Sequence, residues 1–196
     1  IVQLPLPANI SVERITEKIR PDKDVDGFTN RNFGSIVSKH PLLLPATPYG
    51  VMELLKRYKI ETEGKNCVVI GASRLVGAPL SMMLVEEGRA TVTVCHKYTK
   101  DIASFTKQAD ILVVAVGKPG IVTADMVKEG AVVIDVGTTR VEGPQYKNGF
   151  ALKGDVDFKS VAPKTSFITP VPGGVGPMTI ASLLLNTLRA TELRNP

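Results

Sequence analysis

The central part of the chain alternates between short apolar runs and segments with helical spacing. Four runs rich in valine and isoleucine have the length and composition of buried β-strands, and they cover residues 66–71, 91–96, 110–117 and 131–137. Helical patterns separate them at residues 77–87 and 101–108, with a shorter one inside TADMVKEG. Because this alternation is typical of a parallel sheet covered by helices on both faces, we expect an α/β, Rossmann-like, doubly wound sheet domain.

Before this region, the pattern is mixed. Ile10, Ile15 and Ile19 recur among charged residues and predict an amphipathic helix over residues 9–19. The stretch PDKDVDGFTNRNFG that follows has the composition of a polar surface loop. A second helix is expected over residues 48–58, where Thr47 is a suitable cap and Pro48 fits the first turn.

The chain closes with a loop rich in proline and glycine and a final helical pattern. We expect that helix to turn its leucine-rich face inward, with Ile180, Leu183, Leu184 and Leu188 buried. The predicted organisation has three parts. The remainder of an α/β substrate domain with its linking helix occupies residues 1–58, the sheet domain residues 59–170, and a substrate loop with a returning helix residues 171–196.

Composition excludes several classes of protein. Apolar residues make up 43% and charged residues 22% of the chain, as in ordinary globular proteins. No window of about 18 apolar residues is present, which argues against a membrane span. The net charge of +5 is scattered, and the chain has 5% aromatic residues and no tryptophan, so nucleic acid is not an expected partner. A modest positive surplus also suits small acidic ligands, although a solvated charged surface is the default interpretation.

The two cysteines, Cys67 and Cys95, both lie in predicted strands. Buried, reduced thiols in a cytoplasmic protein are the simple explanation. Cys95 is followed by His96, but no further residues with ligand spacing stand nearby, so no metal site is expected. The chain begins with isoleucine on an apolar run, and we expect it to be the later part of a longer protein.

The stretch GASRLVGAP at residues 71–79 joins a predicted strand to a predicted helix. Its spacing is wider than that of the familiar G-x-G-x-x-G loop, with Ser73 and Gly77 following Gly71. A strand that stops at Gly71 and a helix that begins near Gly77 gather backbone N–H groups at one helix N-terminus, which favours phosphate binding. The interpretation is a variant nucleotide loop, although many such turns bind nothing.

The second strand bears on which nucleotide is bound. NAD-binding folds usually carry an acidic residue there for the ribose hydroxyls. Here the strand ends in His96-Lys97, and no carboxylate appears before Asp101. A lysine pairs with a 2′-phosphate, and Arg74 is placed to reach the same region, so NADP is favoured over NAD. The alternative is that Lys97 is a solvated charge at a strand end.

Turns after the third and fourth strands extend the candidate site. Val116-Gly117 and Gly137-Thr138 both follow the carboxyl ends of predicted parallel strands, where open α/β sheets bind ligands. Glycines there permit a flat ring to approach the backbone. Ordinary turn chemistry explains either turn taken alone.

Seven motifs together resemble a known family. VQLPLP, DKDVDGF, PATP, VVIGASRLVGAPLS, VAVGKPG, VVIDVG and ITPVPGGVGPMT occur in the order found in bifunctional methylenetetrahydrofolate dehydrogenase/methenyltetrahydrofolate cyclohydrolase, and the GAS form of the loop looks like that of bacterial members. The resemblance covers essentially the whole chain. It implies NADP-dependent oxidation of 5,10-methylenetetrahydrofolate and hydrolysis of the methenyl product to 10-formyltetrahydrofolate. It further implies a cytoplasmic homodimer in the one-carbon metabolism that serves purine biosynthesis.

The resemblance assigns roles residue by residue. Gln3 matches a glutamine beside a catalytic lysine, Asp26 matches the carboxylate that holds the pterin, and Asp24 is left with a structural part. Pro172 and Gly173 match the loop lining the folate site. The cofactor side comprises Gly71, Ala72, Ser73, Arg74, Gly77, His96, Lys97, Val116, Gly117, Gly137, Thr138 and Thr179.

The sequence also departs from the family. The catalytic lysine and its tyrosine belong to a tyrosine-x-x-x-lysine helix upstream of VQLPLP, and neither Lys18 nor Lys23 stands in that pattern. Thr138-Thr139 replaces a frequent Ile-Asn pair beside the nicotinamide. Two other interpretations therefore stay open. One is a different NADP-dependent dehydrogenase that acts on a hydroxy or keto acid, and the other is an NADP-binding module without turnover.

Overall fold

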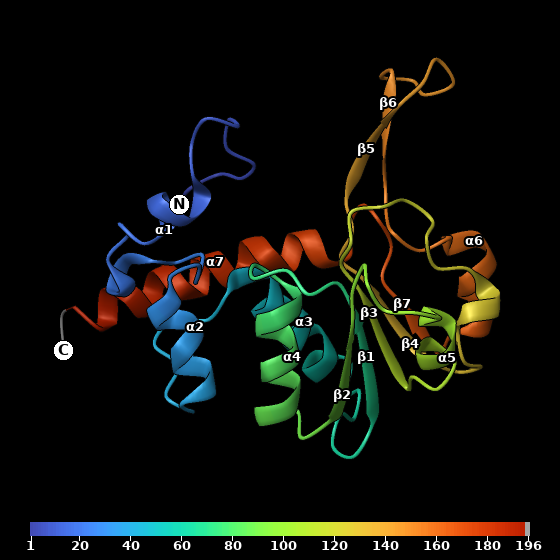
Figure 1. The fold of residues 1–196 in the computed structure, drawn as a ribbon, viewed down its shortest axis with the longest axis horizontal. Coiled ribbons are helices and arrows are strands. Elements are labelled where there is room, and N and C mark those ends of the chain that lie inside the picture. Colours follow the sequence, from blue (N-terminus) through green and yellow to red (C-terminus); the bar gives the residue numbers. More distant parts are fainter. Residues whose placement is uncertain (195–196) are drawn as a thin grey trace.

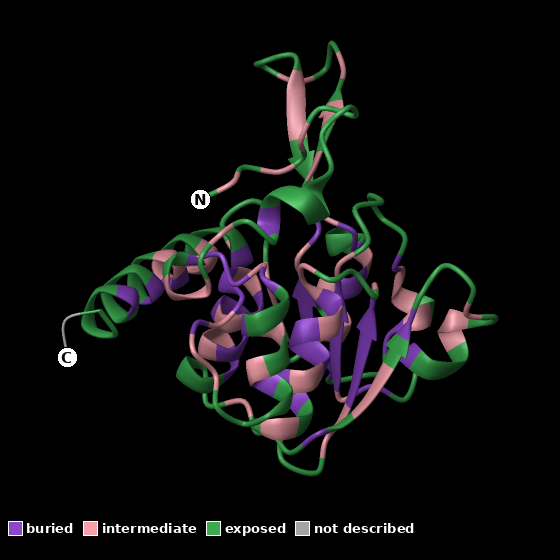
Figure 2. Ribbon diagram, turned by 60° about the vertical axis from the view of Figure 1, so that its left-hand side comes forward, coloured by how far each residue is buried: buried purple, intermediate pink, exposed green. Residues whose placement is uncertain are grey.

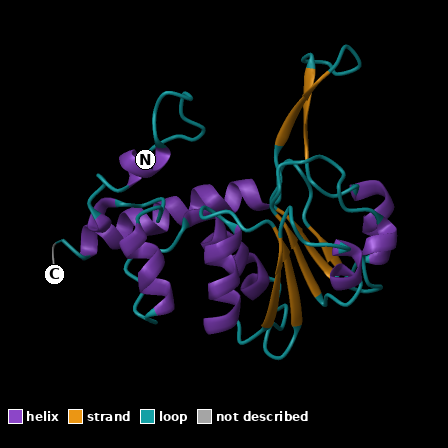
Figure 3. Cartoon of the chain, in the orientation of Figure 1, coloured by secondary structure: helices purple, strands orange, loops and turns teal. Residues whose placement is uncertain are grey.

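The computed structural model describes residues 1–194 and contains one five-stranded, entirely parallel sheet (Figures 1 and 3). The strands lie in the order β2-β1-β3-β4-β7. Their bounds are β1 Asn66–Ile70, β2 Thr91–Cys95, β3 Ile111–Val114, β4 Val132–Asp135 and β7 Phe167–Ile168. The four strands predicted from the apolar runs are confirmed, and the expected α/β, doubly wound class is correct.

Helices cover both faces because alternate side chains of each buried strand point to opposite sides. On one face, α3 (Ala46–Arg57) and α4 (Gly77–Glu86) bury Leu55, Leu80 and Leu84 against the sheet. The other face carries short elements: α5 Ile102–Thr106, η2 Ala124–Met126, α6 Phe158–Val161 and η3 Ala162–Lys164. Between these layers β1, β3 and β4 are almost wholly buried, whereas the edge strands β2 and β7 are mostly half-buried or exposed (Figure 2).

The first part of the chain forms short helices beside this core. They are α1 Val12–Thr16, η1 Pro21–Lys23 and α2 Asn30–Val37. The predicted helix over residues 9–19 is wrong in extent and in the face it buries, since Ile10 and Ile15 are exposed and Thr16 is buried. α2 falls in the stretch expected to be a polar loop. Its start is fixed by Thr29, whose Oγ1 accepts a hydrogen bond from the Asn32 backbone N–H.

The long C-terminal helix α7 (Val175–Glu192) packs along α3, but not on the face expected from its leucines. Ile180, Leu184 and Leu188 are 63%, 68% and 58% exposed, and much of the helix surface is open to solvent (Figure 2). The buried positions are Val175, Ser182, Asn186 and Ala190. Small and polar residues are on the inside because the side-chain Nδ2 of Asn186 donates to the carbonyl oxygens of Val25 and Leu44, at 2.8 and 2.6 Å.

This reversed face gives a testable contrast. Asn186→Ala leaves two carbonyl oxygens without their donor and is expected to lower the free energy of unfolding by about 2 kcal/mol. Leu184→Ala removes an exposed side chain and should change it by less than about 0.5 kcal/mol. Urea unfolding of the two variants measures both values. A larger loss for Leu184→Ala than for Asn186→Ala would contradict the observed orientation of α7.

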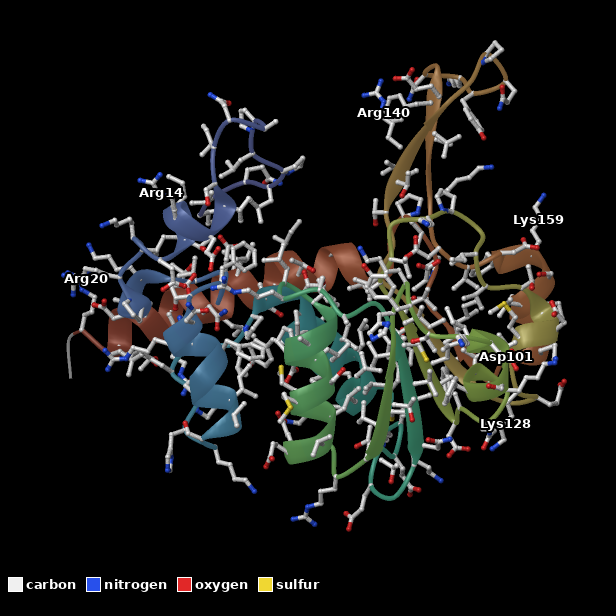
Figure 4. The ribbon with its side chains drawn as sticks, viewed as in Figure 1. Arg14, Arg20, Asp101, Lys128, Arg140 and Lys159 are labelled. Carbon is white, nitrogen blue, oxygen red and sulfur yellow. The ribbon has the colours of Figure 1, made fainter. Side chains whose placement is uncertain are left out.

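An antiparallel hairpin, formed by β5 (Thr139–Glu142) and β6 (Phe150–Lys153), was not expected from the sequence. It projects away from the sheet domain (Figure 1), and Arg140 lies on this arm (Figure 4). The Arg140 guanidinium lies 4.0 Å from the centre of the Phe150 ring across the pair of strands. The hairpin leaves the core after Gly137 and returns to it at Gly154, so its two ends lie beside the turn that follows β4.

Both cysteines are buried and free, as the sequence predicts. Burial raises the pKa of the Cys67 thiol to about 12, so this thiol is un-ionised at neutral pH. Among residues 1–194, no helix combines the length and hydropathy needed to cross a membrane.

Candidate functional site

The loop after β1 lies at the point where the chain order of the sheet reverses. β2 lies on one side of β1 and β3 on the other, and ligands of open α/β sheets bind at such switch points. Gly71 has φ +116° and donates its backbone N–H to the carbonyl oxygen of Cys95 at 2.8 Å. A Cβ on Gly71 would overlap the Ala115 carbonyl, and one on Gly77 would overlap the Gly71 carbonyl. Both glycines are therefore required by close backbone packing.

Ser73 organises the start of α4. Its Oγ accepts from the backbone N–H of Val76 at 3.2 Å and of Gly77 at 3.5 Å, and its carbonyl oxygen accepts from Ala78 N–H at 3.0 Å. Within the described chain, the N–H groups of residues 72–75 donate to no protein acceptor. Free N–H groups before a ten-residue helix fit a phosphate. Ala72 lies in this stretch, as the sequence interpretation requires.

The end of β2 presents His96 and Lys97 beside the same loop. The Nδ1 atom of His96 lies 3.2 Å from the Tyr98 backbone N–H and accepts from it. Lys97 is exposed and its Nζ lies 4.9 Å from the centre of the Tyr98 ring. No carboxylate within residues 1–194 forms an ion pair with Lys97. The positive charge at this strand end is thus available to an anionic ligand.

Arg74 faces the first part of the chain rather than the end of β2. Its Nη2 lies 2.9 Å from Glu17 Oε1 and 3.3 Å from the Phe28 carbonyl oxygen. The guanidinium therefore ties the nucleotide loop to α1 and to the segment before α2. The contact of Arg74 with a 2′-phosphate stays a prediction. It requires the Arg74 guanidinium to leave Glu17 and pair with the phosphate.

The turns after β3 and β4 are held by two aspartates that sequence reasoning missed, Asp135 and Asp155. Both are buried, and the backbone N–H groups of Val116, Gly117 and Gly137 donate to them. Thr138, next in the chain, is exposed. The available signal was a carboxylate inside the apolar run VVIDVG and a second one in GDVD.

Asp26 and Gln3 lie in the first part of the chain, apart from the strand ends. Asp26 is 8% exposed, and burial raises its pKa. The side-chain amide of Gln3 donates to the Leu4 carbonyl. Asp24 has the structural part expected of it, since it accepts from Phe28 N–H, Thr29 N–H and Asn32 Nδ2.

The loop before α7 carries the remaining residues of the predicted site. Pro172 and Gly173 are exposed, Gly173 has φ +103°, and the Gly174 N–H donates to the Pro170 carbonyl at 3.0 Å. Thr179, in the first turns of α7, shares a hydrogen bond with Thr47 of α3, with 3.1 Å between their hydroxyl oxygens. Thr47 lies inside α3, which begins after Pro45, so the expected capping role of Thr47 is wrong.

Comparisons with known proteins agree with this geometry. The family model for the NAD(P)-binding domain of tetrahydrofolate dehydrogenase/cyclohydrolase matches residues 45–195. The bifunctional protein FolD of Cytophaga hutchinsonii is 59% identical over 99% of this chain and 68% of its own length. The crystal structure of the bifunctional enzyme FolD from Campylobacter jejuni has 50% identity and a TM-score of 0.90 over 98% of this chain and 66% of that one.

A third relative, the dehydrogenase-cyclohydrolase (FolD) of Trypanosoma brucei, was solved with NADP cofactor and an inhibitor. It has 43% identity and a TM-score of 0.93 over 99% of this chain and 66% of that one. The chain thus spans about two thirds of the length of these relatives. The strand-end turns and the whole-chain similarity lead to one conclusion: the chain belongs to the tetrahydrofolate dehydrogenase/cyclohydrolase family.

Proposed function

We propose that the protein containing this chain oxidises 5,10-methylenetetrahydrofolate with NADP and hydrolyses the methenyl product to 10-formyltetrahydrofolate. The observation that carries the proposal is the turn after β1. There Gly71 packs on the Ala115 carbonyl at the switch point and leaves unpaired N–H groups in front of α4. Relatives of this chain are named as bifunctional FolD enzymes, one of them as a methylenetetrahydrofolate dehydrogenase/cyclohydrolase.

The residues of this chain have distinct parts in the oxidation. Residues 72–75 bind the phosphates of the dinucleotide, and Lys97 offers a charge to its 2′-phosphate. Asp26 holds the pterin by accepting hydrogen bonds from ring N–H and amino groups. When bound, NADP supplies the acceptor for a hydride released from the one-carbon unit as the N5 lone pair of the folate forms the methenyl double bond. The protein contributes chiefly the placement of the two reactants.

Hydrolysis needs a group that moves protons. Water adds to the methenyl carbon, the bond from that carbon to N5 breaks, and one proton is released, which leaves the formyl group on N10. A lysine with a lowered pKa suits this step. No tyrosine-x-x-x-lysine pattern occurs in residues 1–196. Gln3 orients such a lysine through its amide when the remaining third of the family length is present.

The full-length protein tests the proposal. Mixed with methylenetetrahydrofolate and NADP, it should produce the absorbance of reduced nicotinamide, followed by formation of 10-formyltetrahydrofolate. No reduced nicotinamide with either NADP or NAD refutes the assignment to this reaction. Turnover of a hydroxy or keto acid instead favours a different dehydrogenase on the same fold.

For this chain alone, we propose cofactor binding without turnover. Apart from Thr179, the residues proposed to hold the nucleotide lie within residues 71–138, whereas the catalytic lysine expected from the family does not occur in the chain. Titration of the 196-residue chain with NADPH, followed by nicotinamide fluorescence, should saturate. Measurable dehydrogenase activity of the same preparation would overturn the proposal that it lacks turnover.

Lys97 should set the preference for NADP. Lys97→Asp replaces an attractive charge with a repulsive one and is expected to weaken NADPH binding by about tenfold or more, with much less effect on NADH. Lys159→Asp is the matched control, because this exposed lysine belongs to α6 on a different side of the domain (Figure 4). Dissociation constants for both nucleotides decide the matter, and an unchanged NADPH-to-NADH ratio in Lys97→Asp contradicts the assignment.

We also propose that the full-length protein is a cytoplasmic homodimer whose one-carbon products serve purine biosynthesis. Support comes from the family resemblance, and from two buried thiols that suit a reducing compartment. Light scattering of the full-length protein should give twice the mass of one chain. A monomer at micromolar concentration contradicts the dimer.

A further inference from the structure

Two carboxylates that the proposed reaction does not use lie directly beneath the candidate site. Asp155 is fully buried, and its Oδ2 accepts from the backbone N–H groups of Val116 and Gly117 at 2.6 and 2.9 Å. These two residues form the turn after β3. Asp155 comes from the segment after β6, so its side chain links that segment to the β3 turn, next to the backbone hydrogen bond from Gly120 N–H to the Gly154 carbonyl oxygen.

Asp135, at the end of β4, completes the arrangement. Its Oδ1 accepts from the N–H groups of Gly137 and Asp155, each at 3.0 Å, and its Oδ2 accepts from Val156 N–H at 2.9 Å. One carboxylate therefore joins the point where the β5–β6 hairpin leaves the core to the point where it returns. Together the two aspartates fix three segments, at residues 116–117, 137 and 154–156.

Glycines leave room for this pair from both sides. A Cβ on Gly137 would overlap the Asp155 carboxylate, and a Cβ on Gly154 would overlap the Asp135 carboxylate. Each aspartate thus packs on the glycine that neighbours the other one. The spacing Asp-x-Gly in one segment and Gly-Asp in the other is the sequence form of this reciprocal packing.

The arrangement is costly for stability alone. Two carboxylates are taken out of water close together, and Asp155 Oδ1 is buried without a hydrogen-bond partner among the described residues. Burial accordingly raises the pKa of Asp135. A simpler anchor exists at the opposite end of the sheet. There the half-buried Asp110 accepts from Asn66 N–H at 2.9 Å and from Lys128 Nζ at 2.6 Å.

The fixed turns belong to one half of the dinucleotide site. In doubly wound sheets the ribose that carries the 2′ group lies toward the strand after the nucleotide loop, here β2. The turns after β3 and β4 lie on the other side of the switch point. They are therefore the ones beside the nicotinamide half.

We propose that Asp135 and Asp155 are positioning residues for the nicotinamide half of the cofactor, acting through the backbone of residues 116–117 and 137. The proposal rests on the proposed NADP site. Loss of either carboxylate should weaken binding of the nicotinamide half of the cofactor and not of the adenosine half. A general role in folding would affect both halves. The same carboxylates hold both ends of the hairpin, at Gly137 and at residues 154–156.

The test uses the 196-residue chain and two probes, NADPH and adenosine 2′,5′-bisphosphate, which carries only the adenosine half. Asp155→Ala is expected to weaken NADPH binding about tenfold or more and binding of the bisphosphate less than about twofold. Asp155→Asn keeps a carbonyl acceptor for the Val116 and Gly117 N–H groups and should restore most of the NADPH affinity. Asp110→Ala is the control that lowers the melting temperature and leaves both affinities unchanged.

Each result has a defined meaning. Equal weakening of both probes by Asp155→Ala, unchanged NADPH binding, or an Asp155→Asn variant as weak as Asp155→Ala overturns the positioning role. If Asp155→Ala does not fold, Asp135→Asn is measured in the same way. It must then weaken binding of NADPH and leave binding of the bisphosphate nearly unchanged. A wild-type chain that binds neither probe refutes the NADP site itself and is thereby distinguished from failure of this inference.

Discussion

Gly71→Ala is expected to abolish detectable NADPH binding by this chain and to lower its free energy of unfolding by about 3 kcal/mol or more. The residue has φ +116°, and an added Cβ would overlap the Ala115 carbonyl at the end of β3. Relief of that overlap requires β1 and β3 to separate at the switch point. The turn that presents the N–H groups of residues 72–75 then loses its shape.

Gly64→Ala is the matched control for this prediction. Gly64 also has positive φ, at +70°, but a Cβ there would meet nothing within 4 Å, and the residue precedes β1 at the other end of the strand. Gly64→Ala should lower the free energy of unfolding by about 1 kcal/mol, because alanine disfavours this backbone conformation, and it should leave NADPH affinity unchanged. Equal loss of affinity in both variants would show that stability, and not the shape of the turn, governs binding.

Asp26→Asn is expected to lower kcat/KM of the full-length enzyme for methylenetetrahydrofolate by about 30- to 150-fold, because a hydrogen bond to a charged acceptor contributes about 2–3 kcal/mol. NADPH affinity should stay the same, since Asp26 lies in the first part of the chain. Asp24→Asn is the comparison: it disturbs the bonds to Phe28, Thr29 and Asn32 and should act mainly on stability.

The same residue gives a pH dependence of stability. Burial raises the pKa of Asp26, so the folded state binds its proton more tightly than the unfolded state does. Stability contributed by this group is therefore present at pH values below its ordinary pKa and is lost as the pH rises through the raised value. Asp26→Asn should be more stable than wild type at neutral pH, and urea midpoints should converge as the solution is acidified. A loss of stability in Asp26→Asn at neutral pH would contradict this account.

Four of the five strands were predictable because each is a short run rich in valine and isoleucine, whereas β7 has only two residues and was missed. A run such as NCVVI buries side chains on both faces of the sheet, as strands of parallel sheets do. The glycine turn was predictable for the same local reason, since Gly71 and Gly77 mark close backbone packing. In both cases the residues that determine the local structure lie within a few positions of it in the sequence.

Most of the wrong predictions concern structure that depends on residues far apart in the sequence. The face of α7 was misjudged because leucines at helical spacing normally face inward, whereas here Asn186 is drawn to the carbonyls of Val25 and Leu44, more than a hundred residues away. α2 was missed because asparagine and glycine lower helix propensity, and only its cap at Thr29 compensates. The Asp135–Asp155 pair joins segments separated by the hairpin, and no local pattern reports such a contact.

The central claim is that a dinucleotide lies across the carboxyl ends of β1, β3 and β4, and a crystal structure of the chain with NADP tests it most directly. The account predicts the pyrophosphate within hydrogen-bonding distance of the N–H groups of residues 72–75, with the nicotinamide beside Gly117 and Gly137. A pyrophosphate bound at the opposite end of the sheet, near Lys128, would contradict the account.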